Sequence, residues 1–126
     1  MATNATATGV LNESVPEANL DSWPIPADQV LEGDPQARGL LLWKSDDSKL
    51  ANGIWECTPG RFTWVHADET LCVVEGSATI TPEGGEPFEI RPGVVAFFPE
   101  GTKTEWRVTE TLRKAFHLHS AAGLPL

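Results

Sequence analysis

The sequence predicts an all-β domain in which short antiparallel strands close into a jelly roll. From residue 39 onward, short apolar runs alternate with turn residues, and hardly any helical periodicity is visible. Gly84 and Gly85 stand between two strand-like runs, as expected at a hairpin turn. With 126 residues, the chain is long enough for one domain around a single core.

The N-terminal part of the chain departs from this pattern. Residues 1–20 are rich in Ala, Thr, Asn and Glu and show no apolar periodicity, which predicts a mobile tail. Residues 21–38 contain Trp23 and Ile25 beside two prolines that favour an extended path. We interpret this segment as an extended arm laid over the domain, with a short helical turn at residues 27–31. A plain linker is the alternative.

The strands are expected within residues 39–119, and each run ends at Gly, Pro or a polar turn. In order, the runs are GLLLWK (39–44), GIWECTPG (53–60), RFTWVHA (61–67), ETLCVVEG (69–76), SATITPE (77–83), PFEIRPG (87–93), VVAFFPEG (94–101), KTEWRVTE (103–110) and LRKAFHLH (112–119). No internal repeat is visible, and residues 120–126 are expected to be a C-terminal tail.

Alternation along the run that begins at Glu69 places apolar residues on both of its faces. Glu69, Leu71 and Val73 share one face, and Cys72 and Val74 share the other. A strand that is apolar on both sides needs cover on its outer side. We therefore expect the N-terminal arm or a second subunit to lie there.

The last two runs bring a lysine into the predicted interior. Thr104 and Trp106 share a face and are expected to point inward, as is Phe116. Lys114 lies on the same face as Phe116, so it enters the interior too. A buried lysine is costly unless a carboxylate answers it, and Glu69 is the obvious partner. The pair is expected in a pocket lined by Phe62, Trp64, Trp106 and Phe116.

Composition excludes several classes of partner. Nine basic and eighteen acidic residues give a net charge of −9, which argues against nucleic acid and anionic membranes as partners. No apolar run is long enough to span a bilayer, and the first residues lack the features of a signal peptide. A cytoplasmic location is expected. Cys57 and Cys72 are too few for a disulfide framework and are interpreted as core thiols.

Two stretches carry a resemblance to a known family. Glu69 is followed seven positions later by Gly76, and Gly93 is followed by Pro99 and Gly101. This frame resembles the double motif of the RmlC-like cupin superfamily. The tracts GIWECTPGRFTW, DETLCVVEGSATITPEGGEPFEI, VVAFFPEGTKTEW and LRKAF resemble most the subfamily called Cupin_3 or DUF861, over about residues 38–118. The resemblance implies a double-stranded β-helix and a homodimer.

The histidines of the cupin motifs are missing. The first two metal-ligand positions fall on Phe62 and Trp64, or on Thr63 and Val65 with a shorter spacer, and the third falls on Thr104. One carboxylate does not hold a divalent cation against water. The resemblance therefore implies the scaffold without its usual metal, and no cofactor is expected. Ethanolamine-utilisation cupins and ureidoglycine aminohydrolases belong to the same group, but the latter depend on a metal and two tandem domains.

Three residues are the candidates for chemistry, and each has a purely structural alternative. Glu69 is either a pocket carboxylate that orients a ligand or acts as a general base, or an acid that caps a turn. Lys114 is a ligand-binding cation, a base or imine-forming amine, or only the partner of Glu69. His66 either reaches the mouth of the pocket or is a histidine of a surface turn.

Further residues are weighed beside these. Trp55, Trp64 and Trp106 form either an aromatic platform for a ligand or plain core packing. Glu56 alternates with Trp55 and is a further candidate to face the barrel, ranked below Glu69. His117 and His119 share a face and have the spacing of a metal pair, but no third ligand is evident there.

Three functions stay open at this point. The leading one is a homodimeric, metal-free cupin that binds a small polar or anionic metabolite, with charge from Lys114 and Glu69 and walls from Phe62, Trp64, Thr104, Trp106 and Phe116. The second is an isomerase, lyase or hydrolase with Glu69 or His66 as base and Lys114 as electrostatic stabiliser. The third is a metalloprotein that uses His66 and Glu69.

Overall fold

The computed structural model of the chain describes residues 4–5 and 9–126, and it is built almost wholly of β-strands. In chain order the elements are β1 (Asn4–Ala5), β2 (Leu11–Asn12), β3 (Asp21–Ser22), the 3₁₀ turn η1 (Ala27–Gln29), β4 (Val30–Gly33), β5 (Ala37–Lys44), β6 (Leu50–Cys57), β7 (Gly60–Val65), β8 (Asp68–Pro82), β9 (Phe88–Ile90), β10 (Val95–Phe98) and β11 (Lys103–His119). In the described part, no helix is long and apolar enough to cross a membrane.

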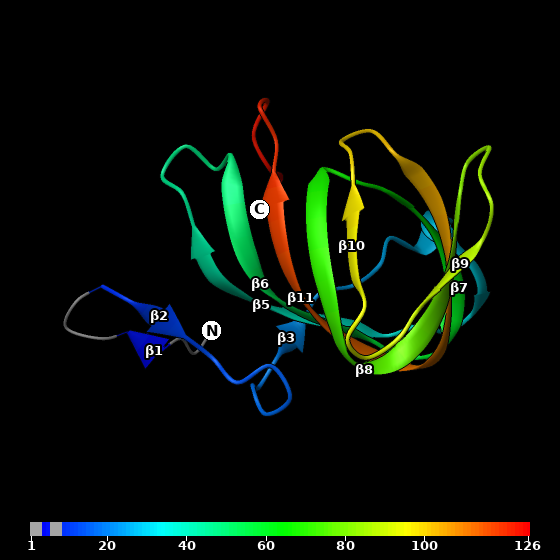
Figure 1. Cartoon of the computed structure of the whole chain (residues 1–126), viewed down its shortest axis with the longest axis horizontal. Helices are drawn as coiled ribbons and strands as arrows, with labels where there is room; N and C mark the ends of the chain where they lie inside the picture. The colour runs from blue at the N-terminus through cyan, green and yellow to red at the C-terminus, as the bar shows by residue number, and fades with distance from the viewer. Residues whose placement is uncertain (1–3, 6–8) are drawn as a thin grey trace.

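Nine of these strands form one antiparallel sheet. Its main path runs β10-β8-β11-β6-β5-β3, with β9 paired to β8 and β7 paired to β11 and β4. The sheet curls on itself, so that β7 and β9 lie across the barrel from β5 and β6 (Figure 1). This confirms the all-β jelly-roll prediction, and the turn at Gly84 and Gly85 joins β8 to β9 as expected.

Two strands are much longer than the sequence predicts. The runs expected as separate strands at 69–76 and 77–83 form one strand of 15 residues, β8, and the last two runs form β11 with 17. Gly76 permits this continuity because it takes φ = 78°, and a Cβ there would lie 2.0 Å from the carbonyl oxygen of Thr111. Shifts of register in β11 near this contact keep the two strands paired.

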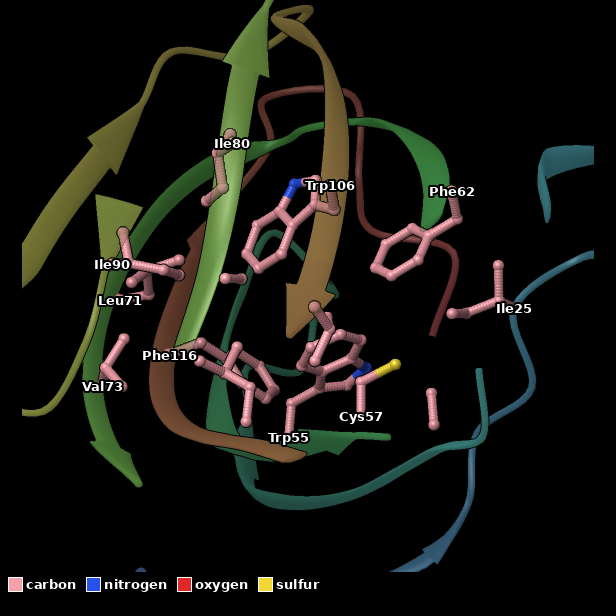
Figure 2. Close-up of a cluster of buried hydrophobic side chains, with 14 of the residues drawn as sticks. Ile25, Trp55, Cys57, Phe62, Leu71, Val73, Ile80, Ile90, Trp106 and Phe116 are labelled. Atoms are coloured by element: carbon pink, nitrogen blue, oxygen red, sulfur yellow. The ribbon is translucent and has the colours of Figure 1, made fainter. Parts of the chain in front are cut away.

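The main core fills the concave side of the curled sheet. Its largest fully buried side chains come from β6, β7, β8, β9 and β11, with Phe62, Leu71, Ile80, Ile90 and Leu112 among them. Figure 2 shows the rings of Trp55, Phe62 and Trp106 turned toward one another in this cluster. The aromatic rings thus gather at one part of the core rather than over its whole length.

The segment that precedes the barrel is packed against it. Ala18 and Leu20 are buried against Leu40 and Ile54, on the outer side of β5 and β6. Residues 15–20 therefore lie on the sheet, although the whole stretch 1–20 was expected to be a mobile tail. Part of that stretch lies outside the described residues, and the domain boundaries stay predictions.

The arm crosses the domain in an extended form. Ile25 is buried in the main core, and Trp23 packs edge-on against Phe116 with ring centroids 6.1 Å apart. The helical turn expected at residues 27–31 is shorter, because the 3₁₀ turn ends at Gln29 and the next residues belong to β4. Leu124, in the expected C-terminal tail, is also buried.

Candidate functional site

A small cavity lies inside the barrel, where the aromatic part of the core meets the arm. Its volume is about 60 Å³. The walls are apolar except for one ion pair. The lining residues are Trp23, Trp55, Phe62, Trp64, Glu69, Trp106, Lys114, Phe116 and Leu118.

The ion pair joins neighbouring strands at the cavity wall. Lys114 Nζ on β11 lies 2.5 Å from Glu69 Oε2 on β8, and both side chains are at least 93% buried. Alternation along the two strands brings both residues to the concave face, as the sequence predicts. Among the described residues, Glu69 is the only hydrogen-bond acceptor of the Lys114 ammonium, which has three N–H donors.

Aromatic rings hold the ammonium from two sides. Lys114 Nζ lies 4.8 Å from the ring centroid of Trp55 and 4.9 Å from that of Trp106. Cation–π attraction in so dry a place adds to the charge pairing with Glu69. Two of the three tryptophans considered as a platform, Trp55 and Trp106, therefore flank a lysine of the protein itself.

Behind Glu69, a chain of hydrogen bonds continues away from the cavity. His66 Nδ1 lies 3.0 Å from Glu69 Oε1, and His66 Nε2 lies 2.8 Å from Thr104 Oγ1. Trp106 Nε1 donates to the same hydroxyl at 2.9 Å, and that hydroxyl lies 3.3 Å from the carbonyl oxygen of Trp64. All ring nitrogens and hydroxyls in this chain therefore have partners.

His66 does not lie where the sequence suggested. It was expected at the mouth of the pocket or on a surface turn, but it is 2% exposed and does not line the cavity. Its ring stacks on Phe98 with centroids 4.1 Å apart. The histidine follows β7 directly, and the short turn before β8 folds it under Glu69, three residues later in the chain.

The surroundings of Glu69 favour its ionised form. Burial is the largest single influence and raises its pKa, but the charge of Lys114 and the hydrogen bonds from His66 and Lys114 outweigh it. The pKa falls from 4.5 to about 2. A carboxylate with so low a pKa is a weak base at neutral pH.

Glu56 was expected to face the barrel, and the structure places it on the opposite side. Its carboxylate accepts hydrogen bonds from Arg113, at 3.0 and 3.2 Å, and from Arg38. Burial acts to raise the pKa of Glu56, and the hydrogen bonds from the two arginines lower it further than burial raises it. Arg113 Nη1 also donates to the carbonyl oxygens of Val15 and Ala18. This outer cluster fastens the N-terminal segment to the sheet.

The residues present do not fit a metal. No three His, Cys, Asp or Glu side chains converge on one point in the described part of the chain. His66 and Glu69 turn their ligand atoms toward each other. His117 is exposed on the outer face, while His119 pairs with Asp68 at 3.0 Å.

Cys57 is not a nucleophile in its environment, and Cys72 is only partly buried. Both are free, and Cys57 is fully buried. Burial is the main reason that the pKa of Cys57 rises to about 12, so its thiol stays protonated at neutral pH. This agrees with the interpretation of Cys57 as a core thiol.

Seven of the nine cavity-lining residues were named from the sequence as pocket or platform residues, while Trp23 and Leu118 were not. A signal for each was present: Trp23 is a large apolar residue directly before Pro24, and Leu118 shares the face of Phe116. Gly39 explains how Trp23 reaches the wall. A Cβ at Gly39 would lie 2.1 Å from Trp23 Cε3, so the indole rests on bare backbone.

The chain is similar to several known proteins. Residues 44–116 match the family model of the EutQ-like cupin domain. The Clostridium difficile EutQ protein superposes with a TM-score of 0.71 at 21% identity, over 95% of this chain and 94% of that one. No curated protein matches the sequence significantly.

Two solved proteins of the DUF861 family are also similar. One, from Pseudomonas syringae pv. tomato and of unknown function, gives a TM-score of 0.76 at 22% identity, over 92% of this chain but only 51% of that one. The other, from Thermotoga maritima, is 35% identical over 52% of this chain and 75% of its own, with a TM-score of 0.50. At 22% identity, the likeness to the Pseudomonas syringae protein shows the fold alone.

Proposed function

Because the chain belongs to the family of EutQ-like cupin domains, we propose that its barrel binds a small polar or anionic molecule through Lys114. A fold of this kind does not by itself imply a function, so the proposal depends on the site. The observation that carries it is the buried Lys114 ammonium, which faces an apolar cavity and has one acceptor among the described residues.

A buried ammonium with unused N–H groups is an unfinished arrangement. Each polar group left unsatisfied in a dry site costs on the order of 1–3 kcal/mol, and more when it is charged. A ligand oxygen at hydrogen-bond distance from Nζ would satisfy one of the two unused N–H groups without removing Glu69. Apolar walls with a few convergent polar groups are typical of small-molecule sites.

The size of the cavity limits the ligand. A volume of about 60 Å³ is well below the roughly 300–1,000 Å³ of ordinary ligand pockets. The ligand is therefore a molecule of a few heavy atoms, or a larger one that inserts a carboxylate, carbonyl or hydroxyl group. Trp23 and Leu118 would contact its remaining part at the cavity wall.

Binding is tested with formate and formamide as probes, followed by amide NMR and tryptophan fluorescence. We expect shifts at Trp55 and Trp106, which contact Lys114, and loss of these shifts in Lys114→Met. Lys103→Met is the matched control, because Lys103 lies on the same strand but is exposed. Failure of both probes to bind at high millimolar concentration would overturn the proposal.

The geometry favours binding over acid–base catalysis. Glu69 is a weak base, and both ring nitrogens of His66 already have hydrogen-bond partners within the protein. A metal-dependent role is the further alternative from the sequence. Elemental analysis of protein purified without chelator tests it, and a stoichiometric transition metal would overturn the metal-free proposal.

We also propose that the chain forms a homodimer through the outer face of β8 and β10. Val95 and Phe97 on β10 are 66% and 60% exposed, and their neighbours on β8 are Cys72 and Thr70. The N-terminal segment covers only the β5 and β6 end of this face. A patch without charged residues is where two copies with a net charge of −9 would repel each other least.

Native mass spectrometry tests the homodimer. We expect a dimer for the natural sequence and a monomer for Phe97→Glu, with Thr70→Glu weakening association less. A monomer at micromolar concentration for the natural sequence would contradict this proposal. A cytoplasmic location is proposed as well, since both cysteines are free thiols. Cell fractionation tests it, and recovery of the protein outside the cytoplasm would overturn it.

A further inference from the structure

The hydrogen-bond chain behind the cavity can hold one additional proton without losing a hydrogen bond. With His66 neutral and its proton on Nδ1, that nitrogen donates to Glu69 and Nε2 accepts from the Thr104 hydroxyl. The same hydroxyl accepts from Trp106 Nε1. Every ring nitrogen then has a partner of the correct kind.

With His66 doubly protonated, the set is also complete. Nε2–H then donates to Thr104 Oγ1, which accepts from Trp106 with its second lone pair. The hydroxyl proton turns to the carbonyl oxygen of Trp64, 3.3 Å away. The two states differ in one proton and in the rotation of one hydroxyl group, and neither requires a heavy atom to move.

The charges near the cavity indicate when the doubly protonated state of His66 is favoured. Glu69 and Lys114 are the titratable groups that face His66, and they cancel. Phe98 from β10 and Trp106 from β11 present only rings to the imidazole, while Asp68 pairs with His119 outside. An anion placed on Lys114 would therefore leave one uncompensated negative charge in a dry site, which is costly.

We propose that the cavity takes up small monovalent oxyanions together with a proton, and that His66 holds this proton with Thr104 as its acceptor. The inference rests on the proposed binding at Lys114 and adds the ligand class and the counter-charge. Lys114 holds the ligand oxygen, Glu69 stays ionised between the two cations, and the proton comes from solvent. The occupied site then has no net charge. Neutral ligands of the same shape bind without a proton.

Formate and formamide separate the two cases, because they have the same planar shape and differ in charge. Affinities are measured by NMR titration between pH 6 and pH 8, where formate stays ionised. If His66 is neutral in the free protein, coupling to one proton lowers formate affinity about tenfold per pH unit and leaves formamide affinity constant. Calorimetry in buffers of different ionisation enthalpy should report uptake of close to one proton with formate alone.

A second readout follows the proton directly. The two ring ¹⁵N resonances of His66 should converge when formate is added, because both nitrogens then carry protons. Thr104→Val removes the acceptor of the protonated ring, so the ratio of formate to formamide affinity should fall at least tenfold. Thr104→Ser, which keeps the hydroxyl, should restore it. Thr111→Val, at an exposed position of β11, is the matched control and should keep the ratio.

The outcomes distinguish this inference from the proposed function. Binding of both probes that depends on Lys114, without proton uptake or change at His66, overturns the inference and leaves the binding function standing. An unchanged ratio in Thr104→Val also overturns it. Failure of both probes to bind overturns the two proposals together. The ¹⁵N readout needs only the natural sequence, so it decides the question even if the variants do not fold.

Discussion

Arg113 and Lys114 are neighbours in the chain, but their side chains lie on opposite faces of β11. Arg113 belongs to the outer cluster, and Lys114 lines the cavity. Arg113 donates from three nitrogens, to Glu56 and to two backbone carbonyls of the N-terminal segment. Lys114 has one acceptor, Glu69, and otherwise meets aromatic rings. The two side chains are equally buried, at 9% and 7% exposed.

The difference separates a structural ion pair from the proposed binding site. The outer cluster is complete: Glu56 is shared with Arg38, and Arg113 fastens a segment of the same chain. The inner pair is incomplete, and space remains beside it. Burial alone would not distinguish them, whereas the number of unused donors does.

The largest expected effect comes from removing one carboxylate of each pair. Glu69→Gln leaves Lys114 charged and without a counter-charge in the core, and we expect a loss of about 3–5 kcal/mol in the free energy of unfolding. Glu56→Gln should cost about 1–2 kcal/mol, because Arg113 keeps two backbone acceptors. Urea denaturation measures both variants.

The proposed difference between the two carboxylates is contradicted if Glu69→Gln and Glu56→Gln lose the same free energy of unfolding. Equal losses would mean that the inner pair is no more isolated than the outer one. The double variant Glu69→Gln with Lys114→Met supplies the control, since it removes both charges. We expect it to recover more than half of the loss seen in Glu69→Gln.

Acid should weaken the inner pair in a defined window. The folded pKa of Glu69 lies at about 2, below its ordinary 4.5, so its contribution to stability is full above pH 4.5 and is lost as the pH falls toward 2. The shift corresponds to about 3 kcal/mol. Urea midpoints between pH 5 and pH 2.5 should fall more steeply for the natural sequence than for Glu69→Gln. Parallel curves would contradict a lowered pKa.

A smaller effect than at the inner pair is expected at Arg113. Arg113→Met removes the donors to Val15 and Ala18, which should cost about 2 kcal/mol and act mainly on the N-terminal segment. Hydrogen exchange should increase at residues 15–20, while formamide binding at Lys114 persists. Arg107→Met, at an exposed position of the same strand, is the control. Loss of formamide binding in Arg113→Met would show that the two faces are coupled.

Period-two alternation was sufficient to predict the inner pair. Glu69 and Lys114 share faces with plainly apolar neighbours, so each was forced inward with its side chain and then required the other. The pocket walls at Trp106 and Phe116 followed by the same rule, whereas Phe62 and Trp64 came from the positions of the cupin motif. Whether these residues bind a ligand stays a prediction, but their convergence on one cavity is observed.

The misplaced residues are those where alternation does not decide which way the side chain points. His66 lies in a turn, where no period fixes the side chain, so its burial depends on how the turn folds. Glu56 alternates regularly, but its neighbour Ile54 is buried on the outer face by the N-terminal segment. Both faces of β6 are therefore apolar, and the pattern does not tell which one is inner. The merging of runs into β8 and β11 depends on a long-range contact at Gly76, which no local signal reveals.

The place that Gly39 leaves for the Trp23 indole has a consequence for how this sequence changes over time. Any side chain at position 39 would collide with the indole, and a smaller residue at position 23 would open the cavity wall to water. The two positions, sixteen residues apart, are thus expected to covary among relatives. Lineages that keep the tryptophan should keep the glycine, and those that lose it should admit alanine or serine on β5.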